Sequence, residues 1–211
     1  MKERGMIFNA EMVRALLDGR KTQTRRIIKD CTVGRDPISK FIKIGKKFIG
    51  CYPEDVPELI RECCPYGVPG DRIWVRETWA EAGASAPDLK LYRANYPEHV
   101  PSIYENVPPA EEIRWTPSIH MPRTASRILL EITNVRVERL NSMHDVDAMR
   151  EGIQNLTTCS HSDFGIPGVV NAQHPVRAFQ LLWESIYGTD SWHANPWVWV
   201  IDFKRVEGGA A

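Results

Sequence analysis

The sequence lacks the features of secreted, membrane-spanning and nucleotide-hydrolysing proteins. Its longest apolar run, residues 197–201, is far shorter than the roughly 20 residues that span a bilayer. Residues 1–6 contain no apolar segment of a secretory signal, so we expect a cytoplasmic protein. The sequence also has no phosphate-binding loop, dinucleotide fingerprint, zincin motif or nucleophile elbow. These absences argue against nucleoside triphosphate hydrolysis, dinucleotide-dependent redox chemistry and zinc proteolysis.

Cysteine and histidine give no sign of a metal site. The five cysteines are an odd number, which favours reduced thiols over a disulfide framework. A zinc site built from Cys51, Cys63 and Cys64 is disfavoured, because Cys63 and Cys64 are adjacent and no C-x-x-C pair is present. The six histidines are scattered, without the spacing of metal ligands on a helix. We therefore expect neither a metal nor a cofactor.

Charge is balanced overall but unevenly distributed. The 27 Lys and Arg residues match the 27 Asp and Glu residues, so the formal net charge is zero. Residues 1–50, however, hold 13 basic and 5 acidic residues, a surplus of +8 that the remaining chain offsets. Such a segment can attract a polyanion, although a solvated surface is the more frequent meaning of a charge run.

Hydrophobic patterning predicts an α+β fold in a single domain, residues 1–211. A chain of 211 residues is long enough to form one hydrophobic core. Apolar residues recur with helical spacing in some segments and alternate with polar residues in others. We predict helices at residues 9–19, 142–153 and 175–187, and strands within 20–29 and at 72–79, 126–140 and 197–206. Short strands with a few helices between them favour a small β-barrel with flanking helices.

Three long, weakly patterned segments separate these elements. We interpret them as insertion loops near residues 30–66, 80–117 and 154–174. Alternation around residues 41–48 indicates a hairpin in the first of them. The second is rich in proline and is a candidate lid, because long loops are often functional.

One short basic segment carries the clearest candidate chemistry. Lys21 precedes Thr24 by three residues, and Arg20, Arg25 and Arg26 surround them. A lysine whose pKa is lowered by burial or by nearby cations can act as the base for a threonine nucleophile. The arginines can supply that effect and can also bind an anion. A Lys-x-x-Thr spacing alone occurs by chance in many sequences.

The same segment resembles a family signature. Gly19-x-Lys21-x-x-Thr24-x-Arg26 resembles the G-x-K-x-x-E-x-R signature of ASCH domains, a PUA-like β-barrel superfamily tied to RNA metabolism. Residues 69–75 resemble the Gly-Asp strand entry of that family, and residues 197–203 resemble its closing strand. The matching blocks cover about half of the chain. The resemblance implies a PUA-like (ASCH) β-barrel in a long form, similar to proteins met in phage and prophage genomes.

Thr24 stands where the common signature has Glu. This departure resembles the small bacterial ASCH enzymes that hydrolyse N4-acetylcytidine, whose catalytic set is Lys, Thr and Glu. In that branch Lys21 and Thr24 match the motif, and Glu151, which follows Ala148, matches the Glu. The resemblance therefore implies an amidohydrolase with Lys21, Thr24 and Glu151 as catalytic residues. The residue pattern alone leaves an equal alternative for Glu151, a solvated residue in the last turn of its helix.

A second candidate site lies on the predicted strand 72–79. Glu77 shares a face with Trp79, so the carboxylate can read a base edge while the indole stacks on the base, with Arg76 as a neighbouring cation. The alternative for Glu77 is an ion pair with Arg26 or Arg72. Of the other tryptophans, we expect Trp183, Trp197 and Trp199 in the core, and Trp115 and Trp192 as stacking candidates beside loops.

Two classes of function remain. The first is hydrolysis of an acylated, N4-acetylcytidine-like modified nucleoside or base. The second is an RNA-binding or RNA-cleaving ASCH module without amidohydrolase activity, in which Arg20, Arg25 and Arg26 contact phosphates. The expected partner is accordingly a modified nucleoside or RNA. We expect no membrane and no obligate protein partner.

Overall fold

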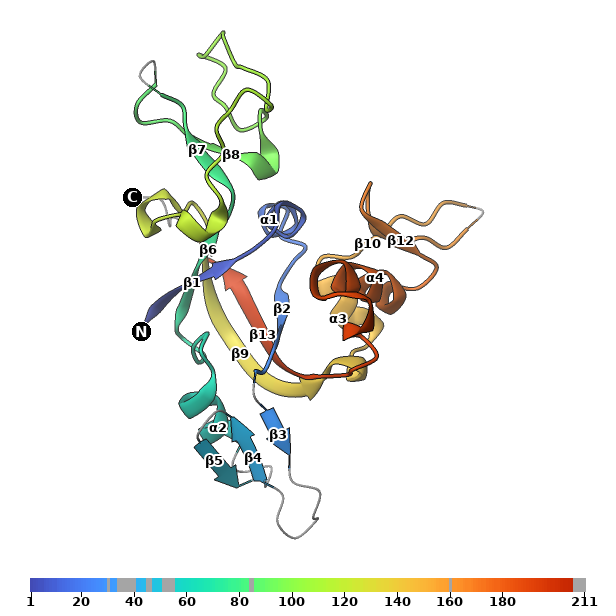
Figure 1. Cartoon of the computed structure of the whole chain (residues 1–211). Coiled ribbons are helices and arrows are strands. Elements are labelled where there is room, and N and C mark those ends of the chain that lie inside the picture. The colour runs from blue at the N-terminus through green and yellow to red at the C-terminus, as the bar shows by residue number, and fades with distance from the viewer. Residues whose placement is uncertain are drawn as a thin grey trace.

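A strongly curved sheet of five strands forms the centre of the computed structural model (Figure 1). The structure describes residues 1–29, 31–33, 41–44, 47–50, 56–83, 86–159 and 161–206. The parallel pair β1–β6 forms one end of the sheet, and every other neighbouring pair is antiparallel. In order across the sheet, the strands are β1 (Glu3–Ile7), β6 (Arg72–Arg76), β9 (Leu129–Arg139), β13 (Trp197–Arg205) and β2 (Gln23–Ile27).

The two edges of this sheet face each other without pairing as strands. In the described part of the chain, β1 pairs only with β6 and β2 only with β13. A side chain connects the edges instead, since Arg26 Nη2 on β2 donates a hydrogen bond to the carbonyl oxygen of Ile7 on β1 at 2.8 Å. The α+β class is confirmed, but the described strands form an open curved sheet and not the closed barrel that we expected.

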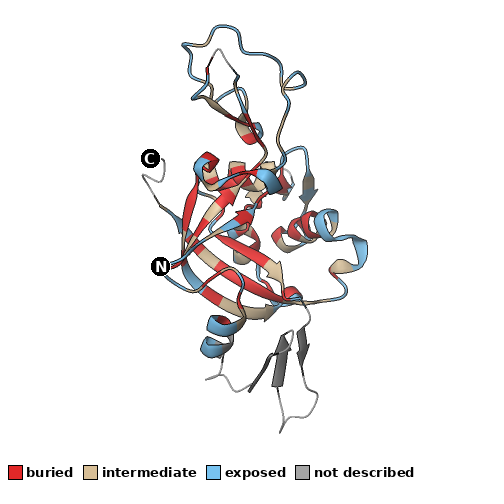
Figure 2. Cartoon of the chain, turned by 60° about the vertical axis from the view of Figure 1, so that its left-hand side comes forward, coloured by how far each residue is buried: buried red, intermediate tan, exposed pale blue. Residues whose placement is uncertain are grey.

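Helices cover both faces of the sheet and create two hydrophobic clusters. Strand β13 divides them, because Trp199 and Ile201 pack into the first cluster while Val198 and Val200 pack into the second. This is the predicted alternation of β13. Buried residues accordingly concentrate in the curved sheet and on the helix surfaces that face it (Figure 2). Helices α1 (Ala10–Leu17) and α2 (Val56–Cys63) contribute to the first cluster, and α3 (Asp145–Arg150) and α4 (Pro175–Tyr187) to the second.

Three smaller sheets lie outside the central sheet, one for each expected insertion (Figure 1). The predicted hairpin near residues 41–48 is present as β4 and β5. The other two sheets were not predicted, because their strands have only two or three residues and show no clear alternation. The small sheets consist of β3 (Cys31–Val33), β4 (Phe41–Ile44) and β5 (Lys47–Gly50); β7 (Trp79–Glu81) and β8 (Lys90–Tyr92); and β10 (Gln154–Asn155), β11 (Phe164–Ile166) and β12 (Val170–Ala172).

The element boundaries follow the predictions most closely near the C-terminus, where α4 has the predicted bounds. The predicted strand 72–79 is divided, because the chain leaves the central sheet after Arg76 and enters β7 at Trp79. No helix in the described ranges has the length and apolar character needed to cross a membrane. Short 3-10 turns occur at Arg93–Asn95, Ser118–His120, Arg123–Ala125, Leu140–Ser142 and Thr189–Ser191.

Candidate functional site

The turn between α1 and β2 fixes the position of Lys21. Asn9 caps the start of α1 as predicted, since its Oδ1 accepts a hydrogen bond from Met12 N at 2.8 Å. Gly19 has a φ of +72° after the end of α1, a conformation that favours glycine. Lys21 N then donates to the carbonyl oxygen of Ala15 at 3.0 Å. Lys21 is therefore held against the end of α1, immediately before β2.

Glu151 enters the same region from the end of α3. It is the C-terminal cap residue, and its backbone N–H donates to the carbonyl oxygen of Asp147 at 2.9 Å. Gly152 follows with a φ of +110°, and a Cβ at this glycine would lie 3.1 Å from Ala15 Cβ. The close approach of α3 to α1 thus needs glycine at this position. Only 3% of Glu151 is exposed, so it is not the solvated helix-end residue of our alternative.

Lys21 and Glu151 form a buried ion pair. Lys21 Nζ donates to Glu151 Oε2 at 2.6 Å and to the Glu151 carbonyl oxygen at 2.9 Å. Burial lowers the pKa of Lys21 below its ordinary 10.5; Glu151 acts in the opposite direction, and the positive charges of Arg26 and Arg25 add to the lowering. The neutral amine of Lys21 is therefore accessible at a lower pH than that of an ordinary lysine.

A cluster of charged side chains holds the other carboxylate oxygen of Glu151. Arg25 Nη1 lies 3.3 Å from Glu151 Oε1, and Arg25 Nη2 lies 3.3 Å from Asp147 Oδ2 and 3.5 Å from Glu138 Oε2. Burial raises the pKa of Asp147, but the hydrogen bond from His144 N and the charges of Arg25 and Arg136 outweigh it and hold the pKa below 3.8. Asp147 is therefore ionised at neutral pH and keeps Arg25 in place.

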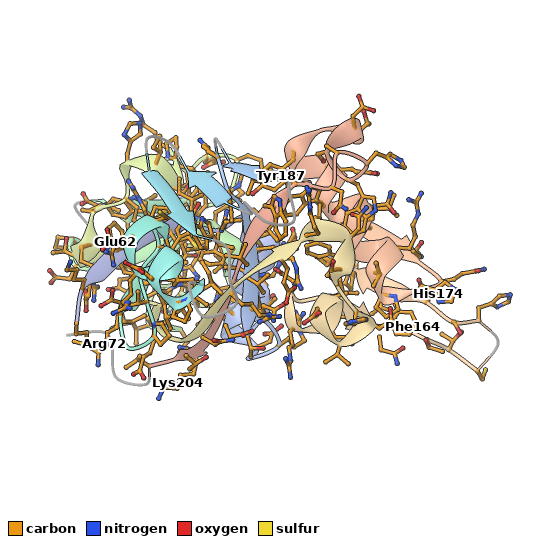
Figure 3. All side chains as sticks on the ribbon, turned by 90° about the horizontal axis from the view of Figure 1, so that it is seen from below. Glu62, Arg72, Phe164, His174, Tyr187 and Lys204 are labelled. Atoms are coloured by element: carbon orange, nitrogen blue, oxygen red, sulfur yellow. The ribbon has the colours of Figure 1, made fainter. Side chains whose placement is uncertain are left out.

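A pocket of about 170 Å³ lies at the seam between the two sheet edges. Its polar side carries Thr24, Arg25, Arg26 and Glu151, and its apolar side comes mainly from α4. Figure 3 shows Tyr187 and His174 at the two ends of α4; Tyr187 is the one that lines the pocket. The full lining is Ile7, Asn9, Met12, Thr24, Arg25, Arg26, Glu151, Phe179, Leu182, Trp183, Ile186 and Tyr187.

The structure brings five of the nine predicted site residues together. Thr24 is buried on β2 opposite Ile201 and lines the pocket, and Lys21 is bonded to Glu151, which also lines it. Arg20 precedes Lys21, and its guanidinium is bound to other protein groups. Arg20 Nη2 lies 2.7 Å from Asp18 Oδ2, and Nη1 donates to the Gly152 carbonyl oxygen at 3.0 Å. The five residues that come together are Lys21, Thr24, Arg25, Arg26 and Glu151.

The other three predicted site residues lie where β6 leads into β7 and do not line this pocket. Glu77 is buried and pairs with Arg127, not with Arg26 or Arg72: Arg127 Nε and Nη2 donate to the two carboxylate oxygens at 2.9 Å each. Trp79 packs into a separate cluster with Tyr92, Met121 and Ala125, and Arg76 Nε donates to the Ser118 carbonyl oxygen at 3.1 Å. These contacts give Arg76, Glu77 and Trp79 structural partners within the protein, so the three residues stabilise the fold around β7 and β8.

Sequence reasoning missed the apolar wall of the pocket. Trp183 belongs to the second hydrophobic cluster, as expected for a core residue, but it also lines the pocket together with Phe179 and Tyr187. Trp192, which we expected to be a stacking residue, is buried in the same cluster. The available signal was the stripe of apolar residues along 175–187, which shows that this helix face is covered but not what covers it.

Sequence reasoning also missed the polar and charged side chains around Arg25. They are Gln23, Arg136, Glu138, Asp147 and Asp202.

Comparison of the chain with protein-family models, with curated proteins and with solved structures gives no match.

Proposed function

We propose that this protein hydrolyses the amide of an acylated modified nucleoside of the N4-acetylcytidine type. One observation carries the proposal: the buried ion pair of Lys21 and Glu151 adjoins a pocket whose wall includes Thr24. The base, the hydroxyl nucleophile and the carboxylate come from the α1–β2 turn, from β2 and from the end of α3. The mechanism requires that Lys21 Nζ, which donates to Glu151 in this structure, comes within hydrogen-bond reach of Thr24 Oγ1 when substrate is bound.

In the first half of the reaction, Thr24 Oγ1 attacks the acyl carbon, and neutral Lys21 Nζ takes the hydroxyl proton. The bond between the acyl carbon and the amine nitrogen then breaks. Lys21 returns the proton to that nitrogen, so the free amine of the nucleoside leaves and an acyl-threonine ester remains.

In the second half, a water molecule attacks the ester carbon and Lys21 again takes the proton. The ester bond to Thr24 Oγ1 breaks, the proton passes to that oxygen, and a carboxylic acid is released. Glu151 orients Lys21 throughout, because its side-chain and backbone oxygens both accept hydrogen bonds from Nζ.

The resemblance to ASCH domains supplies the substrate class of the proposal. The signature residues Gly19, Lys21, Thr24 and Arg26 span the turn after α1 and the strand β2, which form one side of the candidate site. We include in the proposal that the curved five-stranded sheet corresponds to the PUA-like β-barrel of that family. The open seam between β1 and β2 would then be the substrate entrance.

The alternative is an RNA-binding or RNA-cleaving module that uses the positive charge of residues 1–50. The ion pairs of residues 1–29 reduce the charge that such a module could use, whereas the basic residues at 35–47 lie outside the part of the chain whose side chains the structure describes. Arg4 pairs with Asp71, Arg14 with Glu11, Arg20 with Asp18 and Lys21 with Glu151. Arg25 contacts three carboxylates. Much of the positive charge in residues 1–29 is therefore neutralised locally and is not available to the phosphates of a polymer.

The deciding experiment is incubation of the purified protein with N4-acetylcytidine, followed by chromatographic detection of cytidine. We expect turnover by the wild-type protein and loss of turnover in both Thr24→Val and Lys21→Ala. If the wild-type protein is inactive and instead binds RNA with an affinity that falls steeply with salt, the RNA-binding alternative replaces the proposal.

A further inference from the structure

Arg25 is enclosed by acceptors of the protein itself. Its side chain is 0% exposed, and Nη1 lies 3.3 Å from Glu151 Oε1. Arg25 Nη2 lies 3.3 Å from Asp147 Oδ2 and 3.5 Å from Glu138 Oε2, and Nη1 also donates to Gln23 Oε1. The sequence pattern suggested that Arg25 contacts phosphates, but it could reach a phosphate only by breaking these contacts. Its charge therefore acts within the protein.

The Glu151 carboxylate has one cation on each oxygen. Lys21 Nζ donates to Oε2 at 2.6 Å, and Arg25 Nη1 donates to Oε1 at 3.3 Å. The two cations are not equivalent, because a buried lysine amine can lose its proton whereas an arginine guanidinium keeps its charge in proteins. Arg25 therefore stays paired with Glu151 whether Lys21 is charged or neutral.

This difference matters when Lys21 loses its proton. If Lys21 were the only partner of Glu151, its deprotonation would leave a buried carboxylate without a counter-ion, which is a costly state. With Arg25 in place, the carboxylate remains paired and the neutral amine is easier to form. Burial is the main cause that lowers the pKa of Lys21; Glu151 opposes it, and the charges of Arg26 and Arg25 add to the lowering.

Charged groups from β2, β9, α3 and β13 surround Lys21 and Arg25. They are Arg26, Arg136, Glu138, Asp147, Glu151 and Asp202. The charged residues of α1 and its C-terminal end pair elsewhere, Arg14 with Glu11 and Asp18 with Arg20. In the described part of the chain, Lys21 and Arg25 are the two cations that contact the Glu151 carboxylate.

We propose that Arg25 is a positioning residue, the permanent counter-ion of Glu151, which allows Lys21 to lose its proton while the Glu151 carboxylate stays ionised and in place. The proton leaves Lys21 Nζ for solvent, and Glu151 and Arg25 keep their charges. Arg25 needs no contact with the substrate for this role. The inference rests on the proposed function in using Lys21 as the base, and it adds the group that makes the neutral amine accessible.

An NMR titration of Lys21 tests this role without any substrate. Protein with isotope-labelled lysine side chains reports the Lys21 signal, which is identified by its absence in Lys21→Ala. Arg25→Gln removes the charge and keeps a hydrogen-bonding amide, so the midpoint of the Lys21 titration should move to higher pH. Arg25→Lys keeps the charge and should restore a midpoint close to that of the wild-type protein. A midpoint in folded Arg25→Gln that equals or lies below the wild-type midpoint overturns the inference.

Arg139→Gln is the matched control, because it also removes one arginine charge but at an exposed site. Arg139 Nη1 donates to the Asn195 carbonyl oxygen, and its guanidinium lies 4.5 Å from the Trp197 ring. We expect the Lys21 midpoint to be unchanged in this variant. An equal upward shift in Arg139→Gln and Arg25→Gln would show an effect of net charge alone and would overturn the inference.

Glu138→Gln is a second variant in case Arg25→Gln does not fold. Glu138 lies at the more exposed end of the cluster, where its side chain is 27% exposed and contacts Arg25 and Arg136. Removal of this negative charge leaves more of the Arg25 charge to act on the Lys21–Glu151 pair. The Lys21 midpoint should therefore move to lower pH. An unchanged midpoint, or one at higher pH, overturns the inference.

The pH dependence of turnover gives a second measurement. At a pH below the Lys21 midpoint, kcat/KM of Arg25→Gln should fall by roughly three- to tenfold, because less of Lys21 is neutral. At a pH above both midpoints, most of this loss should be recovered. A loss of the same size at every pH would show that Arg25 only supports the fold, and would overturn the inference.

The two proposals fail in distinguishable ways. A Lys21 midpoint that depends on Arg25, in a protein that does not hydrolyse N4-acetylcytidine, would reject the amidohydrolase and support the counter-ion role. Hydrolysis that depends on Thr24, together with a Lys21 midpoint that does not change in Arg25→Gln, would support the amidohydrolase and reject the counter-ion role.

Discussion

Lys21 Nζ lies 2.6 Å from Glu151 Oε2, and the two side chains are 0% and 2% exposed. The residues are 130 positions apart in the chain, so the tertiary fold creates this contact. Because both groups are removed from water, their charges influence each other strongly. The protonation state of Lys21 therefore depends on Glu151, and this dependence can be measured.

The first prediction concerns pH. If neutral Lys21 is the base, kcat/KM rises with pH through the pKa of Lys21, which burial places below 10.5. Glu151 raises that pKa, so Glu151→Gln should lower it further and move the rising limb of the pH profile to lower pH, while reducing the maximal rate. The measurement is kcat/KM against pH for both proteins. A limb that moves to higher pH in Glu151→Gln contradicts the role of Lys21 as base.

The second prediction concerns Thr24. Thr24→Val removes the hydroxyl and keeps the branched shape, so turnover should fall by roughly 10⁴-fold or more, as for the loss of other nucleophiles. Stability should change by no more than about 1 kcal/mol. Thr22→Val is the control, because Thr22 lies two residues earlier and is exposed. Turnover by Thr24→Val at the wild-type rate would exclude the acyl-threonine route.

The sequence predicted the local elements well because their signals are local. Asn9 and Gly19 delimit α1 through a side-chain cap and a positive φ, and the alternation in 197–206 sorts the residues of β13 between two clusters. Lys21 and Thr24 were proposed together because they lie in one short motif. The partner of Glu77 was missed, because Arg127 reaches Glu77 from a segment 50 residues away.

The aromatic wall could not be predicted for a different reason. Trp183 and Tyr187 lie on the apolar stripe of α4, and such a stripe has the same pattern whether it faces a sheet or a pocket. Only the position of α4 beside the open seam of the sheet shows that part of this stripe faces a pocket. The open seam itself depends on which strands pair across it, which alternation within each strand does not specify.

The third prediction tests whether Glu77 is structural. Glu77→Gln leaves the Arg127 guanidinium, which lies 4.0 Å from the Tyr92 ring, without its carboxylate partner. Because breaking a buried ion pair is expensive, the free energy of unfolding should fall by about 3 kcal/mol in denaturant titrations. Cytidine binding should not change, since Glu77 does not line the pocket.

Glu131→Gln is the control for that experiment, because Glu131 pairs with the largely exposed Lys204 and should contribute at most about 1 kcal/mol. Wild-type stability with weakened nucleoside binding in Glu77→Gln would restore the base-reading role for Glu77.

The fourth prediction concerns Gly152, which allows α3 to approach α1. An added methyl group would lie 3.1 Å from Ala15 Cβ and 3.7 Å from Lys21 Cβ, at a φ of +110° that L-residues avoid. Gly152→Ala should therefore lower the free energy of unfolding by roughly 1–3 kcal/mol. It should also reduce turnover, because the shift needed to relieve the contact separates Glu151 from Lys21.

Gly168→Ala separates these two effects. Gly168 also has a positive φ, +74°, but a Cβ there would have no neighbour within 4 Å. This variant should lose stability through backbone strain alone and should keep wild-type kcat/KM. If the folded Gly152→Ala protein also keeps wild-type kcat/KM, then close approach at Gly152 does not position the Lys21–Glu151 pair. Reduced turnover in Gly152→Ala alone, measured well below its unfolding temperature, would show that the packing of α3 against α1 sets the geometry of that pair.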